Sequence, residues 1–122
     1  MREITYEAYK ATVVLIALLE TLWTNSRALA KMGRNTHVMQ DLAKRFSKLH
    51  SRAERLNKEA EDLHFGEVDE DTGHVPGYHP SVAKALRRSA RRMNRDARAV
   101  ARFYDFPTKE MTASDILYYG TE

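Results

Sequence analysis

The sequence predicts an all-α protein, an antiparallel three-helix bundle of long helices with a short C-terminal helix. Apolar residues recur at spacings of three and four residues over three long stretches, and the alternating pattern of a strand is absent. Glycine and proline concentrate between these stretches, where they mark turns and loops. The 122 residues suffice for a single helical domain over 1–122.

The first helix is expected over about residues 5–32, because no glycine or proline interrupts that span. It has two apolar stripes, and together they are wider than one partner helix can cover. This helix is therefore expected to be central in the bundle or to form a subunit interface. A homo-oligomer is expected if the C-terminal segment does not cover the second stripe. The residues assigned to self-association are Tyr9, Ile16, Leu19 and Trp23.

The second helix is expected over about residues 37–64, after a stop at Gly33 and an N-cap at Asn35 or Thr36. Its apolar positions keep the four-three spacing throughout, as in long helices that pack side by side at shallow angles. The span 65–80 follows as the one long loop. It has no periodicity and holds three of the five glycines and two of the three prolines.

The third helix is expected over about residues 81–106, where Pro107 ends it. A capping sequence from Thr112 to Asp115 predicts a last short helix over about 113–119. This C-terminal part of the chain is rich in large apolar residues, which are available to cover the second stripe of the first helix. They are Phe103, Phe106, Met111, Ile116, Leu117, Tyr118 and Tyr119.

Charge is segregated along the chain, although 20 basic and 17 acidic residues leave a formal charge of only +3. The third helix holds eight basic residues from Lys84 to Arg102 and a single acid, Asp96. The basic residues follow the apolar stripe with a shift of two positions, which is a rotation of about 200° on a helix. A cationic face opposite the core is therefore expected. The residues assigned to partner binding on it are Lys84, Arg88, Arg91, Arg95, Arg98 and Arg102.

Like charges one turn apart destabilise a helix by roughly 0.2 to 0.5 kcal/mol per pair, so a negatively charged partner is expected to offset that cost. The leading hypothesis is a non-catalytic module that binds nucleic-acid backbone through salt-sensitive contacts. If the second helix packs antiparallel to the third, Lys44, Lys48 and Arg52 widen the basic patch near Arg95, Arg98 and Arg102.

The sequence leaves open two alternatives to nucleic-acid binding. One is an adaptor or inhibitor, of a kind common among small phage proteins, that docks on an acidic protein surface. The other is purely structural: the basic row is solvated, or the acidic span 59–71 folds back over Arg87 to Arg92 and neutralises it.

Catalysis is the minority interpretation. Arg45 and His50 match the loose spacing of arginine, four residues and histidine seen in some all-helical ribonucleases, where paired motifs serve acid-base cleavage. On a helix these two side chains are about 140° apart, so they need not converge. An all-helical ribonuclease using Arg45 and His50 is therefore the second alternative.

No metal site or cofactor is predicted. The Glu61-x-x-His64 spacing lacks the second copy that a di-iron bundle requires. In the long loop, Asp69-x-Asp71 lacks the later glutamate of a calcium loop. The absence of cysteine favours a reducing compartment, and neither a signal sequence nor an apolar run of about 20 residues is present. A cytoplasmic protein without a membrane span is expected.

Overall fold

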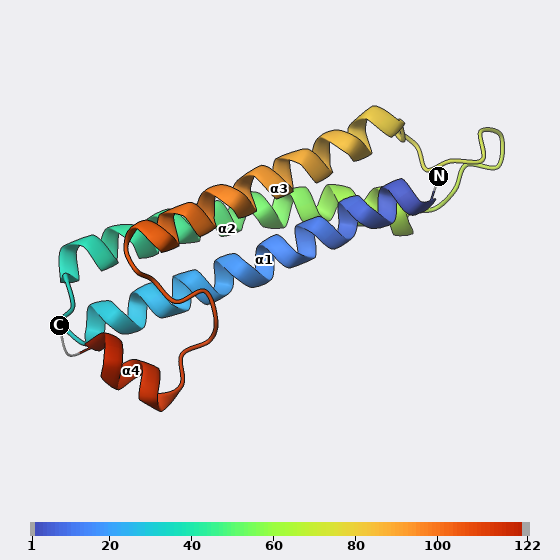
Figure 1. Ribbon diagram of the computed structural model, residues 1–122. Coiled ribbons are helices and arrows are strands. Elements are labelled where there is room, and N and C mark those ends of the chain that lie inside the picture. The colour runs from blue at the N-terminus through green and yellow to red at the C-terminus, as the bar shows by residue number, and fades with distance from the viewer. Residues whose placement is uncertain (1, 121–122) are drawn as a thin grey trace.

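The computed structural model describes residues 2–120, and this range forms four helices without a strand (Figure 1). The three long helices lie side by side, with α2 antiparallel to α1 and α3 parallel to α1. Because α1 packs against each of the other three helices, it is the central element. The predicted three-helix bundle with a short fourth helix is confirmed. The helices are α1 (Arg2–Lys31), α2 (Thr36–Phe65), α3 (Pro80–Phe103) and α4 (Ala113–Gly120).

The tight reversal between α1 and α2 forms at the predicted glycine. Gly33 has a left-handed φ of 84°, which costs glycine little because it has no Cβ. The backbone N–H of Arg34 donates to the carbonyl of Leu29 at 3.2 Å, and that of Gly33 donates to Ala30 at 3.1 Å. This pair of bonds is a Schellman motif, which satisfies the last carbonyls of α1. Asn35 follows as the N-cap residue of α2.

The predicted end of the third helix is wrong by three residues, because a second Schellman motif ends α3 before Pro107. Asp105 adopts a left-handed φ of 49°. The N–H of Phe106 donates to the carbonyl of Ala101 at 2.7 Å, and that of Asp105 donates to Arg102 at 3.2 Å. The chain therefore turns at Asp105 and directs Phe106 into the core, where it is only 6% exposed.

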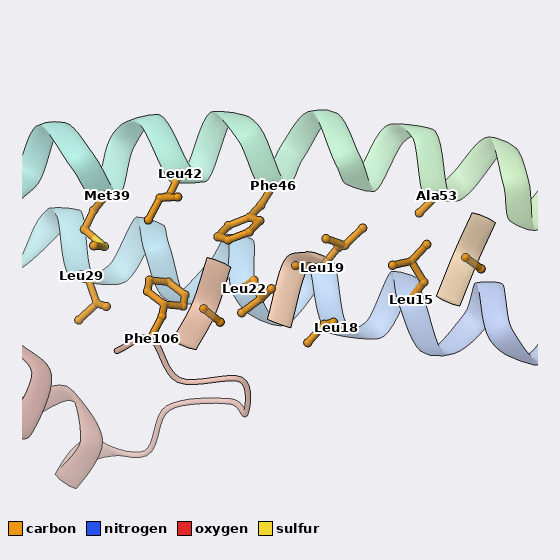
Figure 2. Close-up of a cluster of buried hydrophobic side chains, with 13 residues drawn as sticks. Leu15, Leu18, Leu19, Leu22, Leu29, Met39, Leu42, Phe46, Ala53 and Phe106 are labelled. Carbon is orange, nitrogen blue, oxygen red and sulfur yellow. The ribbon is translucent and has the colours of Figure 1, made fainter. Parts of the chain in front are cut away.

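The main core lies where the C-terminal half of α1 meets the N-terminal half of α2 and the buried alanines of α3. Figure 2 shows Phe46 of α2 and Phe106 of the C-terminal segment close to Leu22 of α1, and the two phenyl rings are 6.0 Å apart. A smaller cluster near the N-terminal end of α1 is built largely from alanine, including Ala8 and Ala83. Such small side chains let the helix axes approach closely.

Polar pairs also join α1 to α2, two of them at partly buried positions and the pair of His50 with Glu20 at an exposed one. The polar residues on α2 recur at intervals of seven, as do two of their partners on α1. An unsatisfied polar group between packed helices is costly, so these pairs favour one register of the two helices over a shifted one. The pairs are Thr5 Oγ1 with His64 Nδ1 at 2.9 Å, Asn57 Nδ2 with Thr12 Oγ1 at 3.1 Å, and His50 Nε2 with Glu20 Oε1 at 3.2 Å.

The central position of α1 explains its wide apolar arc, and it corrects one assignment to self-association. Leu19 is fully buried inside the bundle, so it is not part of an outer surface. Ile16 and Trp23 are half-buried and pack against the main core. The ring of Tyr9 meets that of Phe65 edge-on, with centroids 5.0 Å apart. These residues face neighbours within the chain.

The segment after α3 covers part of α1, as expected, but with fewer residues. Asn25 is 2% exposed, and its Nδ2 donates to the carbonyls of Pro107 at 2.9 Å and Lys109 at 3.0 Å. Met111 packs against the main core. By contrast, Phe103 is 80% exposed and Tyr118 is 69% exposed, so neither covers the second stripe. The side chains of Ile116, Leu117 and Tyr119 lie outside the described part of the chain.

One described helix, α1, also has the length and composition of a membrane span. Over Glu3–Lys31 its most apolar window has a mean hydropathy of 1.3, and 39% of that window is buried in the bundle. The longest uninterrupted apolar run in this helix, Val13 to Leu19, is much shorter than a membrane span, because charged residues such as Glu20 interrupt the apolar sequence. A central bundle helix and a membrane span share such a composition, because both are apolar around most of their circumference.

Candidate binding grooves

The arginines of α3 line a groove between α3 and α1, which we call the arginine groove. It has a cavity volume of about 500 Å³. The sequence predicts these side chains on the face opposite the core, but the structure turns part of the row toward α1. The lining residues are Glu7, Lys10, Ala11 and Val14 of α1, and Ala90, Arg91, Asn94, Arg95, Arg98 and Arg102 of α3. Lys84 and Arg88 are exposed outside it.

Small apolar side chains form the floor of the arginine groove, and cations form its rim. Among the apolar lining residues Ala90 is buried, Ala11 is partly buried and Val14 is 47% exposed. All five cations of the lining are exposed. The one acid in the lining, Glu7, pairs with the Nη1 of Arg87. Arg98 Nε donates to Asn94 Oδ1 at 3.1 Å, which orients that guanidinium without neutralising it.

A second cationic groove lies between α1 and α2, and we call it the tryptophan groove. It has a cavity volume of about 610 Å³. Val14 lines the first groove and Trp23 the second. Their separation of nine residues makes about two and a half helical turns, so the two side chains point in opposite directions from the α1 axis. The two grooves therefore flank α1 on opposite sides. The lining residues are Trp23, Arg27, Ala30, Lys31, Gln40, Ala43, Lys44, Ser47 and Lys48.

The expectation of one widened basic patch is therefore wrong for Lys44 and Lys48. Lys44 and Lys48 line the tryptophan groove, whereas Arg95 and its neighbours line the arginine groove. Arg52 is exposed and lines neither. The cause is the rotation of α2, which turns Lys44 and Lys48 toward the far flank of α1 instead of toward α3.

The acidic span 59–71 does not neutralise the arginines in the described structure. Among the described side chains, ion pairs join Arg87 to Glu7, and His50 to Glu20 and Glu54. The loop after α2, which holds the second half of this span, makes hydrogen bonds within itself: the N–H of Asp71 donates to Asp69 Oδ1 at 2.9 Å. Figure 1 shows this loop extending beyond the end of the bundle, away from most of α3.

The imidazole of His50 lies between two carboxylates instead of facing Arg45. Its Nε2 is 3.2 Å from Glu20 Oε1 and its Nδ1 is 3.0 Å from Glu54 Oε1. The His50 side chain is 14% exposed, whereas Arg45 is exposed on α2. Both imidazole nitrogens are thus engaged within the chain, and neither groove includes this pair.

Two further features bear on ligand chemistry. Within the described residues, no group of three or more histidine or acidic side chains is placed so that it could hold a metal ion.

A smaller cavity of about 380 Å³ lies under the long loop, with His64, His74 and Tyr78 in its lining. The sequence signals for this cavity are weak, because its residues come from the end of α2, the loop and α1.

Comparison of the chain with protein-family models, with curated proteins and with solved structures finds no match.

Proposed function

We propose that this chain is a non-catalytic binding module whose arginine groove docks an acidic amphipathic helix of a partner protein. The observation that supports this function best is the combination of an apolar floor with a cationic rim, between two long helices. A helix laid there would bury small apolar side chains against Val14 and Ala11. Its flanking carboxylates would meet the guanidinium groups of α3.

The spacing of the arginines suits such a ligand. Arg91, Arg95, Arg98 and Arg102 are separated by four, three and four residues, so they span about 16 Å along the α3 axis. A ligand helix that lies alongside α3 has the same helical period. Acidic residues at its positions i, i+4 and i+7 can therefore each lie opposite an arginine. Guanidinium groups bind carboxylates through two parallel hydrogen bonds, which adds geometric selectivity to the charge attraction.

Nucleic-acid backbone, the leading expectation from the sequence, is the competing ligand for this groove. Phosphates would satisfy the arginines equally well in charge. A phosphate backbone has no apolar ridge to place on Val14, however, and the apolar floor would remain exposed to water. For this reason the groove favours a protein helix, and nucleic-acid binding becomes one outcome of the test.

The test compares two double substitutions that change charge equally on the same helix. Arg95→Glu with Arg98→Glu alters the groove, while Arg88→Glu with Arg92→Glu alters exposed residues outside it. The probe is a synthetic amphipathic peptide with an alanine and leucine stripe flanked by glutamates. We expect the groove variant to weaken peptide binding at least roughly tenfold, because charge-assisted hydrogen bonds contribute about 1.5 to 3 kcal/mol each. The outer variant should bind almost as the unchanged chain does.

A scrambled peptide of the same composition and a DNA duplex serve as the competing ligands. We expect the scrambled peptide to bind at least tenfold more weakly, since its apolar residues no longer form a stripe. Val14→Gln, at an exposed position, should weaken binding of the amphipathic peptide and leave duplex binding unchanged. If duplex binds more tightly than the peptide, and both double substitutions weaken it alike, the row is a general nucleic-acid surface and the proposal fails.

A further inference from the structure

The tryptophan groove has an uncompensated positive charge of its own. Its four charged lining residues, Arg27 and Lys31 on α1 with Lys44 and Lys48 on α2, are all cations and all exposed. Within the part of the chain that the structure describes, none of them forms an ion pair. The nearby acid Glu20 is engaged with His50 instead. Each of the two helices that form the groove thus carries two cations one helical turn apart. This placement destabilises each helix in the absence of a bound anion.

An aromatic platform distinguishes this groove from the arginine groove. The Cζ atom of Arg27 lies 5.6 Å from the ring centroid of Trp23, a cation–π contact that holds the guanidinium over the indole. A planar guanidinium or indole is the surface on which an unpaired nucleic-acid base stacks. The lining of the arginine groove includes Ala11, Val14 and Ala90 but no aromatic residue.

From these two observations we infer that the tryptophan groove is a second binding site, for single-stranded nucleic acid. Cations on opposite banks contact the phosphates of a strand that lies along the groove, and one base stacks on the pair formed by Arg27 and Trp23. A duplex is disfavoured because its bases are already stacked on one another. A peptide helix would also meet small residues here, namely Ala30, Ala43 and Ser47, but a helix with an alanine and leucine stripe has no planar group to stack on the pair formed by Trp23 and Arg27.

The two proposed sites are independent of each other. They lie on opposite flanks of α1, and the lining of one takes α1 residues up to Val14 whereas the other begins at Trp23. A strand in the tryptophan groove therefore leaves the arginine groove open to a protein helix. The inferred role of the molecule is to hold an acidic protein next to a single strand.

Trp23 is the only tryptophan of the chain, so its fluorescence reports on this groove alone. The probe is an oligothymidylate of about 12 nucleotides, within the usual site size of small single-strand binders. We expect a saturable change in Trp23 emission, and a slope of log affinity against log salt of about −3, the value for four phosphates on a single strand. Inorganic polyphosphate, which has no bases, should bind at least tenfold more weakly. No emission change at low salt, or equal affinity for polyphosphate, overturns the inference.

Charge reversal locates the binding on the groove. Lys44→Glu with Lys48→Glu should weaken oligonucleotide binding at least tenfold and reduce the salt slope to about −1.4, because two phosphate contacts are lost. The matched control is Arg45→Glu with Arg52→Glu, which makes the same charge change at exposed α2 positions outside both grooves. If the two pairs of substitutions weaken binding equally, binding depends on net charge only, and that result overturns the assignment of the site to this groove.

A charge-conserving substitution tests the stacking platform separately. Arg27→Lys keeps the cation but removes the plane, so we expect several-fold weaker binding with an unchanged salt slope. An affinity equal to that of the unchanged chain overturns the platform. The arginine-groove variant Arg95→Glu with Arg98→Glu should leave this titration unchanged, so failure of the single-strand site is distinguishable from failure of the peptide site.

Discussion

Residues with left-handed backbone end two of the three long helices, α1 and α3, but only one of these residues is a glycine. Gly33 accepts a φ of 84° at little cost, and a Cβ placed on it meets no other atom within 4 Å. Asp105 is the corresponding left-handed residue at the end of α3, with a φ of 49°. Aspartate tolerates this conformation better than most residues, and far better than a β-branched one. The direction of the chain after α3 therefore depends on the identity of residue 105.

We predict that Asp105→Val lowers the free energy of unfolding by about 1 to 2 kcal/mol, because a β-branched side chain clashes in the left-handed region. Asp105→Gly should leave that free energy equal or slightly higher. Urea denaturation followed by circular dichroism measures both. Asp96→Val is the control, since Asp96 is exposed within regular helix, and its effect should stay within a few tenths of a kcal/mol. Equal losses at positions 96 and 105 contradict this account.

At the scale of single elements, the short helix α4 begins at the capping sequence that was predicted. The backbone N–H and the hydroxyl of Thr112 donate to Asp115 Oδ2 at 2.9 and 3.0 Å. In return, the N–H of Asp115 donates to Thr112 Oγ1 at 3.2 Å. The hydrogen bond from the Thr112 backbone, followed by that from its hydroxyl, lowers the pKa of Asp115 below the ordinary value of 3.8.

The sign of this pKa shift predicts how α4 responds to acid. Because the folded pKa is the lower one, the cap is fully stabilising above pH 3.8 and is lost as the pH falls through the lowered value. We expect the amide proton resonance of Thr112 to move with a midpoint below pH 3.8. Asp115→Asn should abolish that titration. A midpoint at or above 3.8 contradicts the capping account.

For the whole molecule, self-association stays a prediction, and the structure changes the surface it requires. Leu19 is buried, whereas Val13 is 42% exposed and Tyr6 is 49% exposed on the outer face of α1. These two side chains are seven residues apart, so they lie on one stripe. A second copy of the chain would meet this stripe rather than the side chains packed in the core.

We predict that Val13→Asp dissociates a dimer into monomers, because it places a charge in the middle of that apolar contact. Helicity should be retained, since the side chain is exposed. Sedimentation velocity with circular dichroism on the same samples measures both properties. A dimer mass that survives the substitution contradicts this interface, and a monomer mass for the unchanged chain contradicts self-association itself.

Most of the elements of this fold could be predicted from the sequence because their causes are local. Periodic apolar positions, the glycine at 33 and the cap at Thr112 act within a few residues of themselves. The error at the end of α3 also has a local cause. Pro107 was the stronger stop signal, but the turn at Asp105 comes first along the chain.

The sequence by itself determined three long amphipathic helices, their order and a dense row of cations on the third. Which flank of each helix faces which groove was decided only by the tertiary structure. Three striped helices can pack with the third on either side of the first two, and the periodicity of the stripes is the same in both arrangements. The choice depends on long-range packing, such as Phe106 against Phe46 and Asn25 against the segment after α3. That packing separates Lys44 from Arg95 and divides one predicted basic patch into two grooves of different chemistry.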